Sequence, residues 1–268
     1  MRAMAFTSRN IKELLRDPLS YIFCLGLPIA MLIVMTCINA SIPKPELPPE
    51  AALAGEAATQ ATKVFNIENL TPGIAVFGLT FIMLFSCIRV SSDRSGSFLT
   101  RLYASPMKSV DFIVGYTLPF GIIALAQVAI TYIAGEIISF IVKGEGFNIL
   151  YLLLSLPLAI PSIILCVGIG IFFGTLLNDK AAPGICSAFI TAAAILGGIW
   201  MDIDSMGDVW VKICSCLPFY HCVNYARYAL AGDYSAMLLP LLIGSAFAIV
   251  IFICSILMFS HKMRSDQN

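Results

Sequence analysis

The chain has 268 residues, of which 59% are hydrophobic and 12% are charged, and its mean hydropathy is +0.91. A soluble domain normally carries about 25% charged residues. Sixteen basic and sixteen acidic residues cancel to a net charge of zero. This composition excludes an ordinary soluble protein and predicts one that is embedded in a lipid membrane.

Six long apolar stretches, separated by polar segments, account for the high hydropathy. They cover residues 20–39, 71–88, 112–134, 149–177, 181–201 and 237–260. An α-helix needs about 20 apolar residues to cross the hydrocarbon core, and only helices or closed barrels satisfy their backbone groups there. The sequence therefore predicts an all-α membrane protein in which residues 20–268 form a domain of six transmembrane helices.

The basic residues are shared unevenly between the segments that flank these stretches. With a cytoplasmic N-terminus, the inner segments hold 11 basic and 6 acidic residues, whereas the outer segments hold 5 basic and 10 acidic ones. Basic residues close to the ends of spans are retained in the cytoplasm. We therefore expect both termini to lie in the cytoplasm.

Residues 1–19 are predicted to form an amphipathic helix at the cytoplasmic surface of the membrane. Met4, Ile11, Leu14 and Leu15 share one helical face, and the opposite face carries arginines and Glu13. Basic residues on the polar face suit a leaflet that contains anionic lipid. The alternative is an ordinary positively charged flank of the first span.

The cytoplasmic segment 89–111 is predicted to contain a short helix between the second and third spans. Its apolar face consists of Phe98, Leu99, Leu102 and Tyr103. Arg94 and Arg101 flank that face, and Ser105-Pro106 ends the helix, because a residue before proline avoids helical geometry. An apolar and basic helix of this kind is suited to docking on a partner or on the membrane.

The segment 202–236, before the last span, is too long for a plain connector. Residues 209–217 and 220–230, separated by Pro218, are predicted to be short interfacial or re-entrant helices. The segment is rich in tryptophan, tyrosine and phenylalanine, which favour the headgroup level of a membrane. Irregular backbone at membrane depth must be buried in protein or line a cavity, so this segment is expected to pack over the outer face of the bundle.

The sequence lacks the residue patterns of common enzymes and metal sites. There is no Gly-x-x-x-x-Gly-Lys-Ser/Thr loop, no His-Glu-x-x-His and no Gly-x-Ser-x-Gly. His221 and His261 are expected at opposite membrane faces, and Cys214, Cys216 and Cys222 match no zinc spacing. We therefore expect neither an enzyme nor a metal site, and we expect no cofactor held by this chain.

Three features inside or beside the spans have alternative interpretations. Gly170 and Gly174 would let another helix approach closely, in the same chain or in another. Phe77, Phe81 and Phe85 recur every four positions, which favours simple packing but could line a path for an amphipathic substrate. Glu136, at the end of the third span, is expected to meet water rather than to form a gate.

Several motifs, in this order and topology, resemble the permease subunits of type-2 ATP-binding-cassette (ABC-2) exporters, the group that includes the daunorubicin-type drug exporters. The resemblance covers nearly the full length and is carried by Asp17-Pro18, the stretch from Asp93 to Pro106, Leu217-Pro218-Phe219-Tyr220, Asn224-Tyr225-Ala226-Arg227 and Gly232-Asp233-Tyr234. Many members carry an acidic residue and Gly-Thr in the signature loop, where this chain has Asp93 and Gly96-Ser97.

The resemblance implies a mechanism and a set of partners. Two six-span subunits, identical or paired with a related chain, would form the pathway, and two separate nucleotide-binding subunits would bind ATP and Mg²⁺ and hydrolyse the ATP. A coupling helix would seat in a cleft of the ATPase. The coupling residues implied in this way are Asp93, Arg94, Gly96, Phe98, Leu99, Arg101, Leu102, Ser105 and Pro106.

The sequence thus predicts a permease subunit that exports a hydrophobic or amphipathic, drug-like molecule across a bacterial cell membrane. The partners expected are the ATPase, a second permease and the lipid bilayer, with no nucleic acid. The alternatives are an exporter of a lipid-linked glycan or peptide, and a membrane scaffold or sensor that docks an ATPase without transport.

Overall fold

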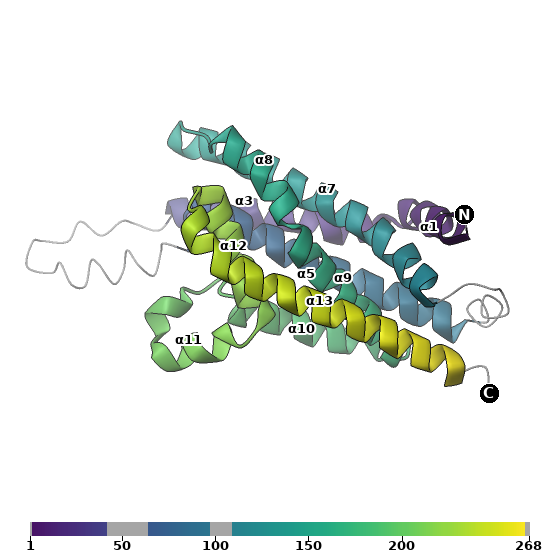
Figure 1. Cartoon of the computed structure of the whole chain (residues 1–268). Coiled ribbons are helices and arrows are strands. Elements are labelled where there is room, and N and C mark those ends of the chain that lie inside the picture. The colour runs from purple at the N-terminus through teal and green to yellow at the C-terminus, as the bar shows by residue number, and fades with distance from the viewer. Residues whose placement is uncertain (1, 42–63, 97–108, 266–268) are drawn as a thin grey trace, which may run out of the picture.

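The computed structural model describes residues 2–41, 64–96 and 109–265 of the chain. Within these ranges every regular element is helical, and the longer helices run alongside one another as a bundle (Figure 1). Both termini lie at one end of this bundle, and α11 and α12 lie at the other. The elements are α1 (Arg2–Leu15), α2 (Pro18–Tyr21), η1 (Ile22–Gly26), α3 (Leu27–Ser41), α5 (Ile67–Ser95), α7 (Ser109–Lys143), α8 (Ile149–Leu158), α9 (Ile160–Leu176), α10 (Ala182–Leu196), η3 (Ile203–Met206), α11 (Asp208–Ser215), α12 (Pro218–Ala231) and α13 (Tyr234–Ser265).

Five helical segments of the described chain are long and apolar enough to cross a membrane. They are Pro18–Ser41, Ile67–Ser95, Val110–Lys143, Ile149–Leu176 and Tyr234–Lys262. The first begins two residues before the expected stretch 20–39, because Pro18 occupies the first helical position and Asp17 accepts a 3.1 Å hydrogen bond from the backbone N–H of Leu19. These segments confirm the prediction of an all-α membrane protein.

The fifth apolar stretch forms a shorter helix than the sequence suggested. We expected a span over 181–201, and α10 covers 15 residues from Ala182 to Leu196. It ends where Gly197 and Gly198 follow, and Gly198 adopts a positive φ of 70°, which a glycine tolerates without strain. The count of six crossings therefore stays a prediction.

The fourth stretch contains a break between α8 and α9 at Ala159. Pro157 lies inside α8, and Pro161 opens α9. A proline has no backbone N–H to donate, and its ring crowds the preceding turn of the helix. Two prolines four residues apart therefore interrupt an otherwise continuous apolar helix.

α9 packs between α5 and α13 in the interior of the bundle, in which α5 is the most buried of the five long apolar segments. A Cβ atom at Gly170 would collide with Ser86 and with the carbonyl of Met83 on α5, and one at Gly174 would lie 2.7 Å from the carbonyl oxygen of Cys87. On the other side the hydroxyl of Ser255 in α13 donates a 2.9 Å hydrogen bond to the carbonyl of Gly168. The small residues thus let neighbouring helices of the same chain approach closely.

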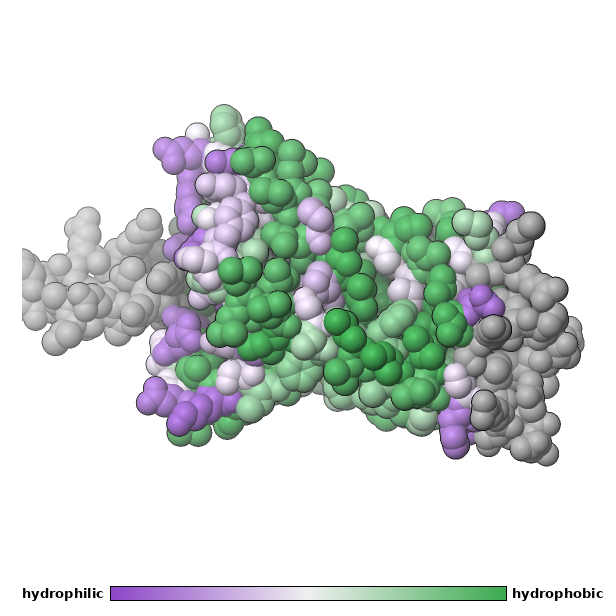
Figure 2. Space-filling view, in the orientation of Figure 1, coloured by the Kyte–Doolittle hydropathy of each residue, from purple (hydrophilic) through white to green (hydrophobic). Residues whose placement is uncertain are grey.

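The surface of the bundle has the pattern expected for a membrane protein. Hydrophobic residues form a broad band around the middle, and hydrophilic residues lie towards the two ends (Figure 2). Much of this band comes from α13, where Leu242, Ile249, Ile253 and Leu257 are half or more exposed. Such a surface has no counterpart on a soluble monomer and is stable when covered by lipid.

The segment before the last span forms η3, α11 and α12, close to the expected boundaries. Phe219, Cys222, Val223 and Tyr225 of α12 are buried, and α12 packs against α5, α8 and α13. Pro218 opens α12 rather than merely separating two helices. This segment therefore belongs to the core at the end of the bundle opposite the termini.

Candidate functional site

The N-terminal helix α1 is attached to the bundle through α7. Phe6 packs edge-on against the rings of Phe112 and Tyr116, with centroid distances of 5.7 and 5.0 Å. Asn10 donates a 2.9 Å hydrogen bond from Nδ2 to the carbonyl of Gly115. A Cβ at Gly115 would strike the Phe6 ring, so glycine is what lets the helix lie this close.

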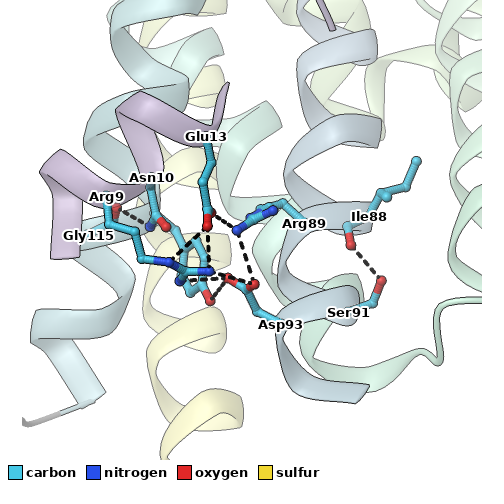
Figure 3. A network of polar contacts seen from close by, with 9 residues as sticks. Arg9, Asn10, Glu13, Ile88, Arg89, Ser91, Asp93 and Gly115 are labelled. Atoms are coloured by element: carbon cyan, nitrogen blue, oxygen red, sulfur yellow. Dashed lines mark hydrogen bonds and ion pairs between the residues drawn. The ribbon is translucent and has the colours of Figure 1, made fainter. Parts of the chain in front are cut away.

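The polar face of α1 turns toward α5 and forms a network of ion pairs with it (Figure 3). Arg9 reaches Glu13 at 2.9 Å and Asp93 at 3.3 Å, and Arg89 pairs with Asp93 at 3.2 Å and also with Glu13. The hydroxyl of Tyr116 on α7 donates a 2.8 Å hydrogen bond to Asp93. We call these five residues the basal network, and it joins α1, α5 and α7.

The geometry of the basal network makes Asp93 its centre. This side chain is 7% exposed, whereas the two arginines and Glu13 are partly open to solvent. A buried carboxylate is costly unless it is paired and hydrogen-bonded, and here two guanidinium groups and one phenol provide the compensation. The two acids and two bases sum to zero charge, so the network can hold three helices together without an unpaired charge.

This arrangement differs from that of an amphipathic helix whose entire polar face is exposed to solvent. Arg9 and Glu13 were expected to point toward water or lipid headgroups, and they point into the protein. Met4 and Leu15, from the apolar face, are 75% and 62% exposed. Those two side chains are therefore available to lipid, while part of the polar face is used for packing.

The basal network overlaps the start of the expected coupling segment, because Asp93 belongs to both. Asp93 and Arg94 are in the last turn of α5, which continues beyond the predicted end of the second span at residue 88. Gly96 follows the helix, and its N–H bonds to the carbonyl of Ser92 at 3.0 Å. The remaining expected coupling residues lie outside the described part of the chain; they are Phe98, Leu99, Arg101, Leu102, Ser105 and Pro106.

The phenylalanine stripe of α5 packs against two other elements. Phe77 is buried and contacts Trp200 at a centroid distance of 5.6 Å. Phe81 and Phe85 are partly buried and lie near Phe23 of the first apolar helix, at 6.3 and 6.2 Å. These contacts account for the stripe as packing, and its role in lining a path stays a prediction.

At the opposite end of the bundle, Arg227 of α12 joins three elements. Its Nε donates to the carbonyl of Asn69 in α5 at 3.2 Å, and its Nη2 donates to the carbonyl of Gly198, after α10, at 2.8 Å. Burial lowers the pKa of Arg227 to about 10, against the opposing influence of Asp202 and Asp204. The guanidinium therefore stays protonated at neutral pH.

The side chains of His221 and Glu136 form hydrogen bonds within the protein, and the cysteines close to His221 in sequence are free thiols. Nε2 of His221 lies 2.8 Å from the carbonyl of Ser215, and Glu136 accepts a 2.7 Å hydrogen bond from the N–H of Phe147. Cys214 and Cys222 are buried, whereas Cys216 is exposed. The described ranges contain no disulfide and no group of three potential metal ligands.

The fold and the basal network together define a multi-pass α-helical membrane protein with a polar assembly at one end of its spans. The chain belongs to the ABC-2 type transporter family, whose model matches residues 2–231. That family is the membrane component of ABC permeases; it pairs with an ATPase component and is not itself the ATPase. A comparison with curated proteins gave no match.

Proposed function

We propose that this protein is the permease subunit of an ATP-driven exporter that moves a hydrophobic or amphipathic, drug-like molecule out of a bacterial cell. The observation that carries the proposal is the basal network. It joins α1, α5 and α7 at the point where the chain enters the segment that resembles the family's coupling loop. Movement of that segment would therefore be transmitted to α1, α5 and α7 together.

In this mechanism, two ATPase subunits dock on the segment from Asp93 to Pro106 in the cytoplasm, where both termini also lie. Closure of the ATPase pair on ATP moves the coupling segment. Because Asp93 and Arg94 belong to the same helix as the phenylalanine stripe, displacement of the coupling segment tilts or rotates α5 as a unit. A ligand biases such a switch only through different contacts in the two states, and the docked segment provides that difference.

A second permease subunit would complete the pathway, and α10 offers the surface for it. Pro183, Gly184, Ala188 and Ala192 on this helix are exposed. The hydroxyls of exposed Ser187 and Thr191 bond back to carbonyls of their own helix, at 2.8 and 3.0 Å. Helices in membranes associate through small residues of this kind. We infer that a second copy or a related chain seats on this face, with the phenylalanine stripe nearby as a path for cargo.

The coupling role is tested by purifying the permease with its ATPase partner and reconstituting both in liposomes. Arg101→Glu or Leu102→Asp is expected to lower co-purification of the ATPase and cargo-stimulated ATP hydrolysis by about tenfold or more, while the permease stays inserted. Lys180→Glu reverses a charge in the exposed turn between α9 and α10 and serves as the matched control.

Two results would speak against the proposal. Unchanged co-purification and transport in both coupling variants would remove the docking assignment. ATP hydrolysis without movement of any amphipathic compound across the bilayer would favour a scaffold or sensor over an exporter.

A further inference from the structure

A polar pocket lies at the end of the bundle opposite the termini and is separate from the basal network. Its volume is about 370 Å³, which is within the range of small-molecule sites. It is bordered by α12, by η3 and its flanks, and by the start of α5. The charged and polar side chains that line it are Asn69, Asp202, Asp204, Ser205, Asn224, Arg227 and Tyr228.

The positive side of the pocket is fixed in place. Arg227 is held by the two backbone carbonyls described above, which belong to α5 and to the turn after α10. Those bonds use Nε and Nη2, and the side chain also borders the pocket. A guanidinium has five donors in a rigid fork that matches the oxygens of a phosphate or carboxylate. The site therefore presents a positioned anion receptor.

The negative side of the pocket is formed by two carboxylates on η3 and its flank. Asp204 accepts a 3.1 Å hydrogen bond from the hydroxyl of Tyr220, which orients it. Asp202 and Asp204 both act electrostatically on Arg227, yet among the described residues neither comes within 4.0 Å of its nitrogens. Opposite charges thus face the same pocket without closing onto each other.

Such a separation of charge needs an explanation. Flexible acids near a partly buried arginine would normally form an ion pair with it, because the arginine has lost much of its hydration. Here the carbonyl bonds hold Arg227 on one wall, and the Tyr220 bond holds Asp204 on the other. A ligand with both signs of charge would satisfy both walls at once.

We propose that this pocket binds a zwitterionic group that combines a phosphate or carboxylate with an ammonium. The anionic end sits on Arg227, and the ammonium sits between Asp202 and Asp204. Tyr228 borders the same pocket, and an aromatic ring attracts a cation placed over its face within about 6 Å. The same chemistry occurs in the phosphoethanolamine headgroup of a lipid and in small soluble zwitterions.

The test uses the full-length protein in detergent and measures two sources of the ligand. In the first arm, calorimetry measures binding of soluble O-phosphoethanolamine, with inorganic phosphate as the comparison. In the second arm, native mass spectrometry measures retention of phosphatidylethanolamine against phosphatidylglycerol. The variants are Asp202→Asn combined with Asp204→Asn, and Ala231→Phe, which fills the pocket without changing its charge.

The wild type is expected to bind the zwitterion in at least one arm, and both variants are expected to weaken that binding by about tenfold or more. Asp208→Asn removes an exposed carboxylate at the same end but outside the pocket, and it should leave binding unchanged. Binding in the lipid arm alone identifies a headgroup site, and binding in the soluble arm alone identifies a site for a free molecule.

The inference is overturned if neither source binds, or if the double variant binds the zwitterion as tightly as the wild type does. It is also overturned if inorganic phosphate binds as tightly as O-phosphoethanolamine, because the carboxylates would then contribute nothing. None of these readouts depends on the ATPase or on transport, so their failure is distinguishable from failure of the proposed exporter function.

Discussion

The hydroxyl of Tyr116 on α7 donates a 2.8 Å hydrogen bond to the carboxylate of Asp93 on α5, and both side chains are buried. The same carboxylate lies within 3.3 Å of Arg9 on α1. One aspartate therefore connects the N-terminal helix to two of the long apolar helices. It lies two residues before Ser95, the last residue of α5, and it is the first of the expected coupling residues.

Loss of the Tyr116 hydroxyl should weaken this connection. Tyr116→Phe preserves the ring that packs on Phe6 but removes a donor to a buried carboxylate. We expect a loss of about 1–2 kcal/mol in the free energy of unfolding, measured by thermal or denaturant unfolding in detergent. Tyr21→Phe is the matched control, because the buried Tyr21 hydroxyl has no hydrogen-bond partner in the described ranges. Equal destabilisation by both changes would contradict a specific role for Tyr116.

Close approach of α9 to α5 should depend on the absence of a side chain at Gly170. Gly170→Ala places a methyl group against Ser86 and the carbonyl of Met83, so the helices must move apart. We expect destabilisation of about 1–3 kcal/mol, as for other overpacked cores. Gly121→Ala on α7 meets nothing within 4 Å and should be neutral or slightly stabilising. A Gly170→Ala protein as stable as Gly121→Ala would show that this contact is loose.

The two ends of the bundle should differ in their accessibility to a membrane-impermeant thiol reagent in intact cells. Cys216 is exposed at the end opposite the termini, and Asn178 is exposed in the turn between α9 and α10. With the other cysteines replaced, a membrane-impermeant maleimide should label Cys216 directly. It should label Asn178→Cys only after the cells are permeabilised. The reverse labelling pattern would show that the topology is opposite to the one expected and that the coupling segment does not lie in the cytoplasm.

The start of α13 should lose stability at low pH through Asp233. Its Oδ1 accepts hydrogen bonds from the Ser235 hydroxyl at 2.7 Å and from the Ala236 N–H at 3.1 Å. These bonds lower the pKa of Asp233 below 3.8, so the charged form is favoured in the folded protein. The stabilisation is fully present above pH 3.8 and is lost as pH falls through the folded-state pKa.

Asp233→Asn tests this effect, because the amide oxygen can still accept these bonds but carries no charge. The wild type should unfold at a higher temperature than Asp233→Asn at neutral pH, and the difference should shrink toward pH 3. Asp208→Asn, an exposed position at the start of α11, provides the comparison. A difference that grows on acidification would contradict this assignment.

The length of the hydrophobic stretches was sufficient to predict the class of fold. Apolar stretches of about 20 residues have few alternatives to a spanning helix. Pro218 correctly marked the boundary between the two short helices before the last span, although it begins α12 and does not lie between the helices. The length of α10 was missed, because an apolar run that continues past Gly197 has no change in hydropathy to mark the end of the helix.

The basal network could be predicted only in part. Arg9 with Glu13 and Arg89 with Asp93 are each four residues apart, so each pair could be read as a helical ion pair. Their meeting across α1 and α5 depends on how the helices pack, and one sequence carries no information on that packing. Tyr116 gave no signal, since a tyrosine in an apolar helix looks like any other large side chain.

The length of α10 has a consequence for the bilayer around it. A helix of 15 residues extends only about 22 Å, whereas the hydrocarbon core is about 30 Å thick. If α10 forms the sixth crossing, this shortfall would be met by local thinning of the lipid or by water that reaches below the headgroups. A polar group beside such a crossing would have a shorter apolar distance to pass than one beside the five longer apolar helices.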